Sequence, residues 1–379
     1  MNKAFFINGG SGRVLCSMPA LERYAETDDN FVIVAESWGE LYLCNKKLRD
    51  KVYFPMNKDL FENQLKDRKI ISPEPYRVNQ YFNQKCNLIQ AFDIEINGLD
   101  DVRDSGKINL DLSKEEQITG YNLVDEVRQT LQKEKVIVLQ PFGQSSKMEG
   151  RFIYDNTGRS FEVTNVQQLI EELRDDYGII LMSEIEIPGW QEQGIAHPKG
   201  VDLNKWIGVI NAADYFLGCD SVGQHMANSV GKPATVVIGS TYPQNISYPD
   251  NKNFTIIDNG EGRRRYSPIR LTHDIYTDRN NEDLMVLDSS RVKEIVKSIK
   301  DKIGVSKKVT DSKSPTAIPP KKLSPSNSSS VCNDVKGGSY PKKILSTPKS
   351  TVKYNGFQKP KSDKKKPIDK LLDIEAKKV

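Results

Sequence analysis

Short runs of β-branched and other apolar residues recur between positions 4 and 257, and turn-forming residues separate them. Runs of this length and composition predict strands that are buried inside a sheet. The predicted strands occupy residues 4–7, 31–35, 51–54, 135–139, 179–182, 215–217, 234–238 and 254–257.

Between these strands, apolar residues return every three or four positions, which is the spacing of a helix with one buried face. The predicted helices cover residues 14–24, 38–43, 121–133, 166–177, 203–213, 224–230 and 289–303, and Ser37 is the expected N-cap of the second. Strands that alternate with helices predict an α/β protein with parallel sheets.

The pattern is weaker between residues 56 and 120. Residues 76–84 are expected to form a helix that carries aromatic side chains, residues 87–96 have a mixed pattern, and residues 100–114 are polar and loop-like. We assign this region to the remainder of the first domain.

The chain has 379 residues, which is enough for two domains of ordinary size and an additional segment. The strand at residues 135–139 opens a second α/β series. We therefore expect an N-terminal domain at residues 1–134, a C-terminal domain at residues 135–304 and a tail at residues 305–379.

The tail differs from the rest of the chain in composition and charge. It holds 18 lysines, no arginine, six acidic residues and eight of the 19 prolines, so its net charge is +12. The whole chain carries +4, and residues 1–304 therefore carry −8. Such a tail is expected to be disordered and to contact a polyanion, such as nucleic acid or an anionic membrane surface. A solubilising or tethering linker is the alternative.

The five cysteines are scattered without paired spacing, and no Cys/His cluster suggests a metal site. The sequence has neither a recognisable signal peptide nor an apolar run long enough to span a membrane. These features predict a cytoplasmic protein without a transmembrane segment, a bound metal or a cofactor.

Residues 214–240 read as a strand, a tight turn, a short helix and a second strand. Small and polar residues fill the turn at 218–223, and Gly231 and Pro233 end the helix. A turn of this kind leaves backbone N–H groups free at a helix N-terminus, where they bind an anion, most often a phosphate. An ordinary β-α-β turn without a ligand is the alternative.

A second glycine-rich loop follows the first strand, at residues 8–12. Glycines there allow a ligand to approach the backbone closely, but the loop has neither the Walker A sequence nor the spacing of a dinucleotide site.

Together the two stretches resemble the signature of the heptosyltransferases, family nine of the glycosyltransferases. The matching residues are Asp220-Ser221, His225, Gly231-Lys232-Pro233 and the Ile-Gly-Ser-Thr run at 238–241, with Gly12 and Pro19-Ala20-Leu21 in the first stretch. The resemblance covers about residues 4–304. It implies a GT-B fold, in which two Rossmann-like domains face a cleft, with the acceptor on the N-terminal side and the nucleotide-sugar on the C-terminal side.

The resemblance also implies roles for individual residues. The donor would contact Lys147, Asp220, Ser221, Val222, Gly223 and His225, and the acceptor-side loop would comprise Gly10, Ser11, Gly12 and Arg13. For His225, packing of a helix is an equal alternative, and for Lys147, a solvated side chain. Arg151 is a second basic candidate, and Glu184 and Glu186 are weaker candidates for ribose hydroxyls. Arg263–Arg265 are expected to form a charged loop, with lining of the cleft as the alternative.

Two positions depart from the family pattern. Val222 stands where the family has glycine, with Gly223 following it, and Arg13 stands where the family has the aspartate that acts as general base. Arginine keeps its proton and cannot act as a base, although it could bind a phosphate or an acidic acceptor. The catalytic residue is therefore unknown.

The favoured hypothesis is a metal-independent glycosyltransferase that moves a sugar from a nucleotide-sugar to a glycan or another acceptor. The alternative is an inactive GT-B-shaped binding or structural protein.

Overall fold

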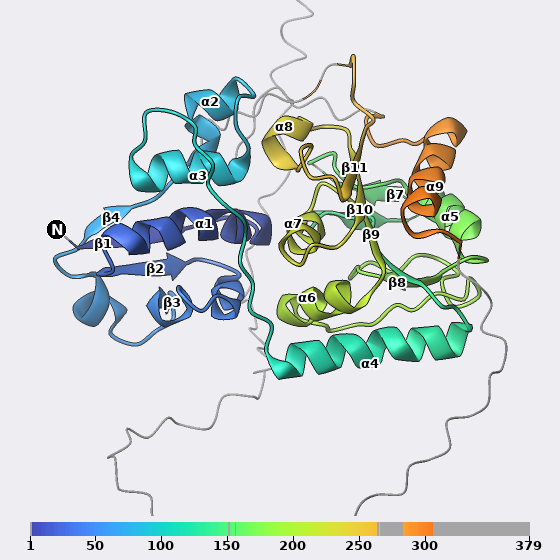
Figure 1. Ribbon diagram of the computed structural model, residues 1–379, viewed down its shortest axis with the longest axis horizontal. Coiled ribbons are helices and arrows are strands. Elements are labelled where there is room, and N and C mark those ends of the chain that lie inside the picture. Colours follow the sequence, from blue (N-terminus) through green and yellow to red (C-terminus); the bar gives the residue numbers. More distant parts are fainter. Residues whose placement is uncertain (1, 151, 156, 264, 266–282, 306–379) are drawn as a thin grey trace, which may run out of the picture. The chain divides into compact units, whose positions relative to one another are not determined.

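Two parallel β-sheets organise the part of the chain that the structure describes (Figure 1). The computed structural model describes residues 2–150, 152–155, 157–263, 265 and 283–305. Residues 306–379, which include nearly all of the basic tail, lie outside the described residues.

The N-terminal sheet has the strand order β3-β2-β1-β4, with all pairs parallel. Its strands are β1 (Lys3–Ile7), β2 (Phe31–Ala35), β3 (Val52–Tyr53) and β4 (Lys69–Ile71). Its helices and helical turns are α1 (Ser11–Thr27), η1 (Gly39–Cys44), η2 (Arg49–Lys51), η3 (Phe61–Leu65), η4 (Pro75–Arg77), α2 (Asn79–Phe82) and α3 (Leu88–Asn97).

The C-terminal sheet has the order β11-β10-β9-β5-β8 and is also parallel. Its strands are β5 (Val136–Gln140), β8 (Gly178–Leu181), β9 (Tyr215–Cys219), β10 (Ala234–Ile238) and β11 (Phe254–Asp258), and β6 (Lys147–Glu149) and β7 (Phe152–Tyr154) form a separate antiparallel hairpin. The associated helices are α4 (Lys114–Leu131), α5 (Val163–Leu173), α6 (Leu203–Ala212), α7 (Val222–Ser229), α8 (Pro243–Ile246) and α9 (Ser289–Ile303).

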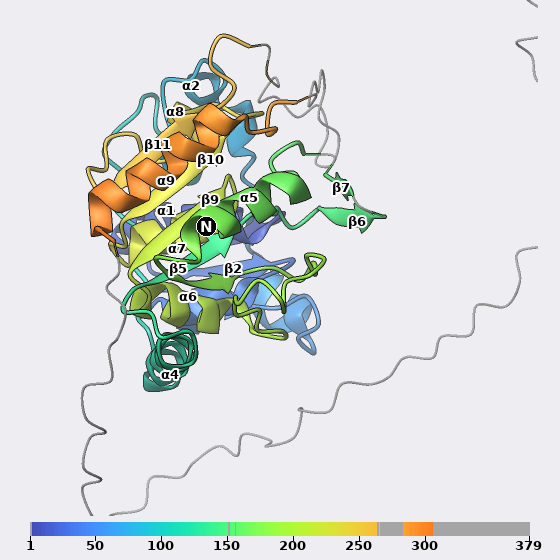
Figure 2. The same ribbon diagram turned by 90° about the vertical axis from the view of Figure 1, so that its right-hand side faces the viewer.

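Helices cover both faces of the C-terminal sheet, which explains why its strands are continuously apolar. Along β5, Ile137 and Leu139 belong to the core under α5 and α9, whereas Val136 and Val138 belong to the core on the opposite face, under α6 and α7. Figure 2 shows α5 and α9 together on one face of this sheet.

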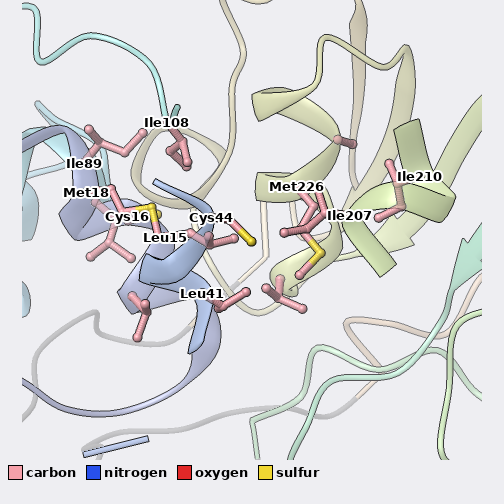
Figure 3. Close-up of a cluster of buried hydrophobic side chains, with 14 of the residues drawn as sticks. Leu15, Cys16, Met18, Leu41, Cys44, Ile89, Ile108, Ile207, Ile210 and Met226 are labelled. Carbon is pink, nitrogen blue, oxygen red and sulfur yellow. The ribbon is translucent and has the colours of Figure 1, made fainter. Parts of the chain in front are cut away.

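The core on the α6 and α7 face continues into the N-terminal half, so the two halves share one hydrophobic cluster. Figure 3 shows its side chains directed toward one another from α1, η1 and α3 on one side and from α6 and α7 on the other. Labelled members are Leu15, Cys16, Met18, Leu41, Cys44, Ile89, Ile207, Ile210 and Met226.

Two asparagines hydrogen-bond across the same boundary. The buried Asn245 side chain donates from Nδ2 to Tyr81 O at 2.7 Å and to Cys86 O at 3.0 Å. Asn204, at the start of α6, donates from Nδ2 to Glu40 O at 3.2 Å. Buried carbonyl groups of the N-terminal half therefore obtain their partners from the C-terminal half.

Each sheet has one point where the strand order reverses. β1 lies between β2 and β4, and β5 lies between β8 and β9. Ligands of open α/β sheets bind beyond the carboxyl ends of the strands at such points. The two glycine-rich stretches singled out in the sequence follow β1 and β9, so both lie at these edges.

The predicted bounds of β2, β10 and α9 are confirmed without change, and the other predicted strands are correct to within two residues. Helix ends are less accurate. α1 extends beyond the predicted 14–24 at both ends, α5 ends at Leu173 rather than at 177, and α7 begins at Val222 rather than at 224.

The helix predicted at 38–43 is wrong in type, because η1 is a 3-10 helix, and Ser37 is not its cap. Trp38 occupies the N-cap position with a left-handed backbone (φ 60°), and its side chain makes no capping hydrogen bond. A residue with this conformation cannot start a regular α-helix at its own position.

The helix predicted at 76–84 is mostly absent: one turn, α2, remains after the 3-10 turn η4. The mixed stretch 87–96 is instead a regular helix, α3, whose start is fixed by a capping box between Asn87 and Gln90. A second capping box, between Ser113 and Glu116, starts α4 at Lys114, seven residues before the predicted position. Both boxes are readable in the sequence.

The domain boundary predicted at residue 134 stays a prediction. Helix α4, which precedes it, crosses α6 of the C-terminal half at glycines in both helices. A Cβ atom at Gly208 would lie 2.1 Å from Glu116 O, and one at Gly120 would lie 2.2 Å from Gly208 O. The two backbones therefore approach closely enough to exclude any side chain at either position.

No helix in the described residues is long and apolar enough to cross a membrane.

We expect Gly208→Ala to lower the free energy of unfolding by about 2 kcal/mol or more, because overpacking against a backbone oxygen outweighs the gain of about 1 kcal/mol in helix propensity. The midpoint of urea unfolding measures the change. Asn211→Ala, at an exposed position of the same helix, is the control and should change stability little. Equal stability of Gly208→Ala and wild type would contradict the close crossing of α4 and α6.

Candidate functional site

The candidate donor site lies where β9 ends and α7 begins, at the carboxyl edge of the C-terminal sheet. β9 runs to Cys219, Asp220 follows, and Ser221 is the extended N-cap of α7 (φ −149°). The backbone N–H groups of Val222 and Gly223 therefore belong to the first turn of a helix. Such groups, with the helix dipole, favour an anion.

Asp220 is buried, and three side chains converge on its carboxylate. Gln224 donates from Nε2 to Oδ1 at 2.9 Å, Thr241 donates from Oγ1 to Oδ2 at 2.8 Å, and the Arg159 guanidinium lies 3.9 Å from Oδ2. Burial raises the pKa of Asp220 above its usual value, and the charge of Arg159 opposes that rise. Asp220 is thus fixed in orientation by residues from α7, from the loop between β7 and α5, and from the segment after β10.

Gly223 is required at its position by close packing. Its N–H donates to Gln140 Oε1 at 2.8 Å, and the same Gln140 side chain donates from Nε2 to Ser221 Oγ at 3.3 Å. A Cβ atom at position 223 would lie 2.4 Å from Gln140 Oε1 and 2.5 Å from the Phe216 ring. Gln140 lies at the end of β5, and the sequence alone assigned it no individual role in the site.

The packing of Val222 accounts for the glycine that stands one residue later than in the family pattern. Its side chain is buried and belongs to the core shared by the two halves. The close approach that demands glycine falls instead on position 223. The shift therefore leaves a glycine in the first turn of α7.

Arg159 reaches the site on a loop built around Asp155. The carboxylate of Asp155 accepts hydrogen bonds from the backbone N–H groups of Thr157, Arg159 and Ser160, at 2.8, 3.2 and 3.1 Å. Burial alone would raise the pKa of Asp155, but hydrogen bonds from Ser160 and Thr157 lower it overall. Ser160 Oγ also accepts from Gly143 N at 2.9 Å, which joins this loop to the segment after β5.

The structure does not bring the predicted basic residue Lys147 to Asp220. Lys147 is exposed in β6, where it pairs across the hairpin with Tyr154, as its solvated alternative predicts. Arg151 lies outside the described residues. Arg159, which had no sequence signal beyond its charge, is the cation beside Asp220.

The remaining candidates are placed elsewhere. Glu184 and Glu186 are exposed, and Glu186 lies 3.9 Å from the Lys199 ammonium group. Arg265 is not part of a simple charged loop: it is buried, donates to both oxygens of Asp258, and donates to Thr241 O at 2.7 Å. Arg264 lies outside the described residues.

On the N-terminal side, Gly10 is the N-cap of α1 and Ser11 its first residue. Gly9 has a positive φ of 86°, and a Cβ atom there would lie 2.7 Å from Arg13 Cδ, so the turn passes directly over the arginine side chain. Gly9 and Gly10 are exposed. A Cβ atom at Gly10 would lie 3.5 Å from Gln144 Oε1, so the loop after β5 approaches this turn.

The Arg13 side chain is directed into the N-terminal half and is only 3% exposed. Its guanidinium donates to Glu74 Oε1 at 3.1 Å, to Pro73 O at 3.1 Å and to Asn8 O at 2.9 Å. It also lies over the ring of Tyr76, 5.1 Å from the centroid. These internal contacts use the guanidinium that could otherwise bind a phosphate or an acidic acceptor. Glu74 was not identified from the sequence.

His225 joins the two motifs by contact between α1 and α7. A Cβ atom at Gly12 would lie 3.2 Å from His225 Cδ2, and Cys16 Sγ lies 3.7 Å from His225 Nδ1. Nδ1 also shares a 2.7 Å hydrogen bond with Tyr248 OH. Burial lowers the pKa of His225 to about 4, with a further contribution from Arg159. The imidazole is therefore neutral at pH 7 and packs two helices together, as its alternative interpretation predicts.

The site offers helix amides and the Arg159 cation for an anion, and hydrogen-bonding groups on Asp220, Ser221 and Thr241 for hydroxyl groups. Two assignments stay predictions. The first is contact with the donor by Lys147, Asp220, Ser221, Val222, Gly223 and His225. The second is an acceptor-side loop formed by Gly10, Ser11, Gly12 and Arg13. Among the described residues, no group of three or more His, Cys, Asp or Glu side chains could hold a metal ion.

Comparison with known proteins shows similarity in fold rather than in sequence. No protein-family model matches the chain, and no curated protein matches it. TibC, a bacterial iron-containing dodecameric glycosyltransferase from enterotoxigenic E. coli H10407, is similar with a TM-score of 0.53 and 12% identity, over 79% of this chain and 76% of that chain.

The structure of the heptosyltransferase TibC in complex with ADP-D-β-D-heptose is similar with a TM-score of 0.52 and 13% identity, over 79% of this chain and 75% of that chain. A family 9 glycosyltransferase from Veillonella parvula has a TM-score of 0.49 and 11% identity, over 68% of this chain and 85% of that chain. The two TibC comparisons confirm the predicted fold class, the GT-B arrangement of two Rossmann-like halves.

Restoring the carboxylate of the family pattern should destabilise the protein. Arg13→Asp would place a second carboxylate beside buried Glu74, and loss of one partner of a buried ion pair costs about 3–5 kcal/mol. The double variant Arg13→Met, Glu74→Gln leaves no buried charge at these two positions, so its free energy of unfolding should fall by less. The free energy of urea unfolding measures both. Lys66→Asp, at the exposed pair with Glu62, is the control and should change stability by less than about 1 kcal/mol. An Arg13→Asp variant as stable as wild type would contradict the buried pair.

The lowered pKa of His225 predicts acid sensitivity. In the unfolded chain the imidazole binds a proton near pH 6.5, but in the folded chain only near pH 4. Between these values the unfolded state binds more protons, so this contribution to stability is complete above pH 6.5 and is lost as the pH falls toward 4. The loss is on the order of 3 kcal/mol.

Urea unfolding of wild type and His225→Asn at pH 7 and pH 4.5 measures this effect, and the variant should lose less stability on acidification. His197→Asn is the comparison, because burial lowers the pKa of His197 as well. The raised pKa of Asp220 acts with the opposite sign and is common to all three proteins. Equal acid sensitivity of wild type and His225→Asn would show that His225 is not buried as a neutral group.

Proposed function

We propose that this chain is a glycosyltransferase that moves a sugar from a nucleoside-diphosphate sugar to a hydroxyl group of an acceptor. The observation that carries the proposal is the turn from Asp220 to Gly223, which opens α7 at the strand-order reversal of the C-terminal sheet. The GT-B fold supports it, because the TibC structure with the same fold is a complex with ADP-D-β-D-heptose.

In this proposal the leaving diphosphate lies on the first turn of α7. The N–H groups of the turn, the helix dipole and the Arg159 guanidinium neutralise its charge, so the reaction needs no metal ion. Gln140 Oε1 now accepts from Gly223 N, and a phosphate oxygen bound there would take its place. Asp220, with its orientation fixed by Gln224 and Thr241, would accept hydrogen bonds from the donor sugar.

A catalytically inactive binding protein is the second candidate, because a specific observation favours it. Arg13 occupies the position of the usual general base and is buried in an ion pair with Glu74. A chain that kept the donor turn and lost the base would bind nucleotide-sugars without turning them over. Turnover by the wild-type protein decides between the two candidates.

We also propose that the protein functions in the cytoplasm. The described cysteines Cys16, Cys44, Cys86 and Cys219 are all free thiols. Free buried thiols are typical of a reducing compartment.

We expect the full-length chain to bind at least one of ADP-heptose, UDP-glucose and GDP-mannose, as measured by calorimetric titration. Arg159→Ala should weaken binding of the corresponding nucleoside diphosphate about 10- to 100-fold, because a charge-assisted hydrogen bond contributes roughly 1.5–3 kcal/mol. Binding of the nucleoside without phosphates should not change.

Arg263→Ala is the matched control, since Arg263 is exposed and its NH1 donates to Asp283 O, away from Asp220. Its affinity for the diphosphate should equal that of wild type. Absence of binding to all three sugars at millimolar concentration would refute the donor site.

A further inference from the structure

With Arg13 and Glu74 paired to each other, the proposed reaction lacks the base that its family pattern provides. Arg13 cannot accept a proton, and the Glu74 side chain is buried against the Arg13 guanidinium, where an acceptor hydroxyl group cannot reach it. Glu22, also on α1, is buried and accepts hydrogen bonds from Asn45 and Asn109. A base on the N-terminal side therefore has to come from another element.

Glu36 is the carboxylate that the fold places beside the glycine-rich turn. It directly follows β2, and its N–H donates to Ile7 O at 3.1 Å, which extends the parallel pairing of β2 with β1. Its backbone therefore lies next to Asn8, where the turn at Gly9 and Gly10 begins. In dinucleotide-binding Rossmann folds, an acidic residue at the end of the second strand, beside the glycine-rich turn after the first, hydrogen-bonds a ribose hydroxyl group.

The Glu36 side chain is exposed, and in the described part of the chain it makes no hydrogen bond or ion pair. It differs in this from Glu22 and Glu74 of the same half. Gly9 and Gly10 are exposed as well, and Gln144 of the C-terminal half approaches Gly10. Glu36 thus stands at the surface where the carboxyl edge of the N-terminal sheet approaches the loop after β5.

The turn that carries Glu36 is held in an uncommon conformation. Trp38 has a left-handed backbone (φ 60°, ψ 22°), a conformation that is uncommon for any residue other than glycine. The next residue, Gly39, is closely packed, because a Cβ atom there would lie 2.8 Å from the Phe54 ring and 3.0 Å from Ala35 Cβ. The carbonyl oxygen of Glu40, which follows Gly39, accepts a hydrogen bond from the Asn204 side chain of the C-terminal half.

Three consecutive residues of this turn carry groups that can contact a sugar: the exposed carboxylate of Glu36, the exposed hydroxyl of Ser37 and the half-buried indole of Trp38. Carboxylate and hydroxyl groups bind sugar hydroxyls, and an indole ring packs against the apolar face of a sugar ring.

We propose that Glu36 binds the hydroxyl group of the acceptor and acts as its general base. This inference rests on the proposed glycosyltransferase function. The acceptor oxygen forms a bond to the anomeric carbon of the donor, and the bond from that carbon to the diphosphate oxygen breaks. The hydroxyl proton passes to the Glu36 carboxylate, and the nucleoside diphosphate leaves with the electron pair. Ser37 and Trp38 contact the acceptor sugar.

The test measures nucleoside diphosphate release by the full-length protein from whichever of ADP-heptose, UDP-glucose and GDP-mannose it binds, with water as the acceptor. Glu36→Gln should lower kcat by about 10²- to 10⁴-fold, the range for loss of a general base, without changing the Kd of the donor. Glu36→Asp should retain part of the rate. Added formate should partly restore Glu36→Ala and should have no effect on wild type, which a structural role of Glu36 would not produce.

Glu62→Gln is the matched control, an exposed glutamate of the same half whose partner is Lys66, and it should keep the wild-type rate. Because Glu36 is exposed, all variants should unfold at the wild-type temperature. Wild-type turnover that is unchanged in Glu36→Gln would overturn the role of Glu36 and leave the proposed function standing. Donor binding without any release by wild type would overturn both the base and the transfer reaction, and absence of donor binding would overturn the donor site itself.

Discussion

The contact between the first turns of α1 and α7 is the constraint on which the rest of the site depends. The imidazole of His225 lies in front of Gly12 and against Cys16, and a Cβ atom at position 12 would lie 3.2 Å from the imidazole, which would have to shift to make room. Since α1 follows β1 and α7 follows β9, this contact brings the carboxyl edges of both sheets to one region. The shared apolar core behind the contact keeps it dry and keeps the imidazole neutral.

Charge is distributed unevenly around that contact. On the N-terminal side, Arg13 is neutralised internally by Glu74, and Glu36 remains exposed. On the C-terminal side, the charge of Arg159 lowers the pKa of both Asp155 and Asp220. The two sides therefore suit different partners: an anion fits the side with the helix amides and the arginine, whereas hydroxyl groups fit the side with the exposed carboxylate.

Local patterns in the sequence were sufficient to predict the elements whose signals are complete within one segment. The apolar run of β10 and the helical spacing of α9, with Gly304 after it, gave correct bounds. The capping boxes of α3 and α4 are equally local signals, and in α3 the apolar residues Leu88, Phe92 and Ile96 repeat every four positions, so the start of this helix was predictable as well. Trp38 shows the opposite case, because no local pattern in the sequence signals its left-handed backbone.

The partners of the site residues could not be predicted in the same way. Arg13 meets Glu74, and Asp220 meets Arg159, across long separations in sequence, and no spacing rule connects such pairs. The sequence identified the turns, because glycine and small residues mark them directly. The fold then decided which charged residue each turn would face.

The crossing of α4 and α6 has a consequence for how this fold can diverge. Gly120 and Gly208 lie far apart in the sequence, yet each one excludes a side chain at the other helix. The two positions therefore constrain each other: neither glycine can be replaced by a larger residue unless the helices first move apart. Such a move would shift α4, which leads into β5 and Gln140 through only a few residues. Lineages that share this crossing should consequently keep both positions small, even where little else in their sequences is still recognisably alike.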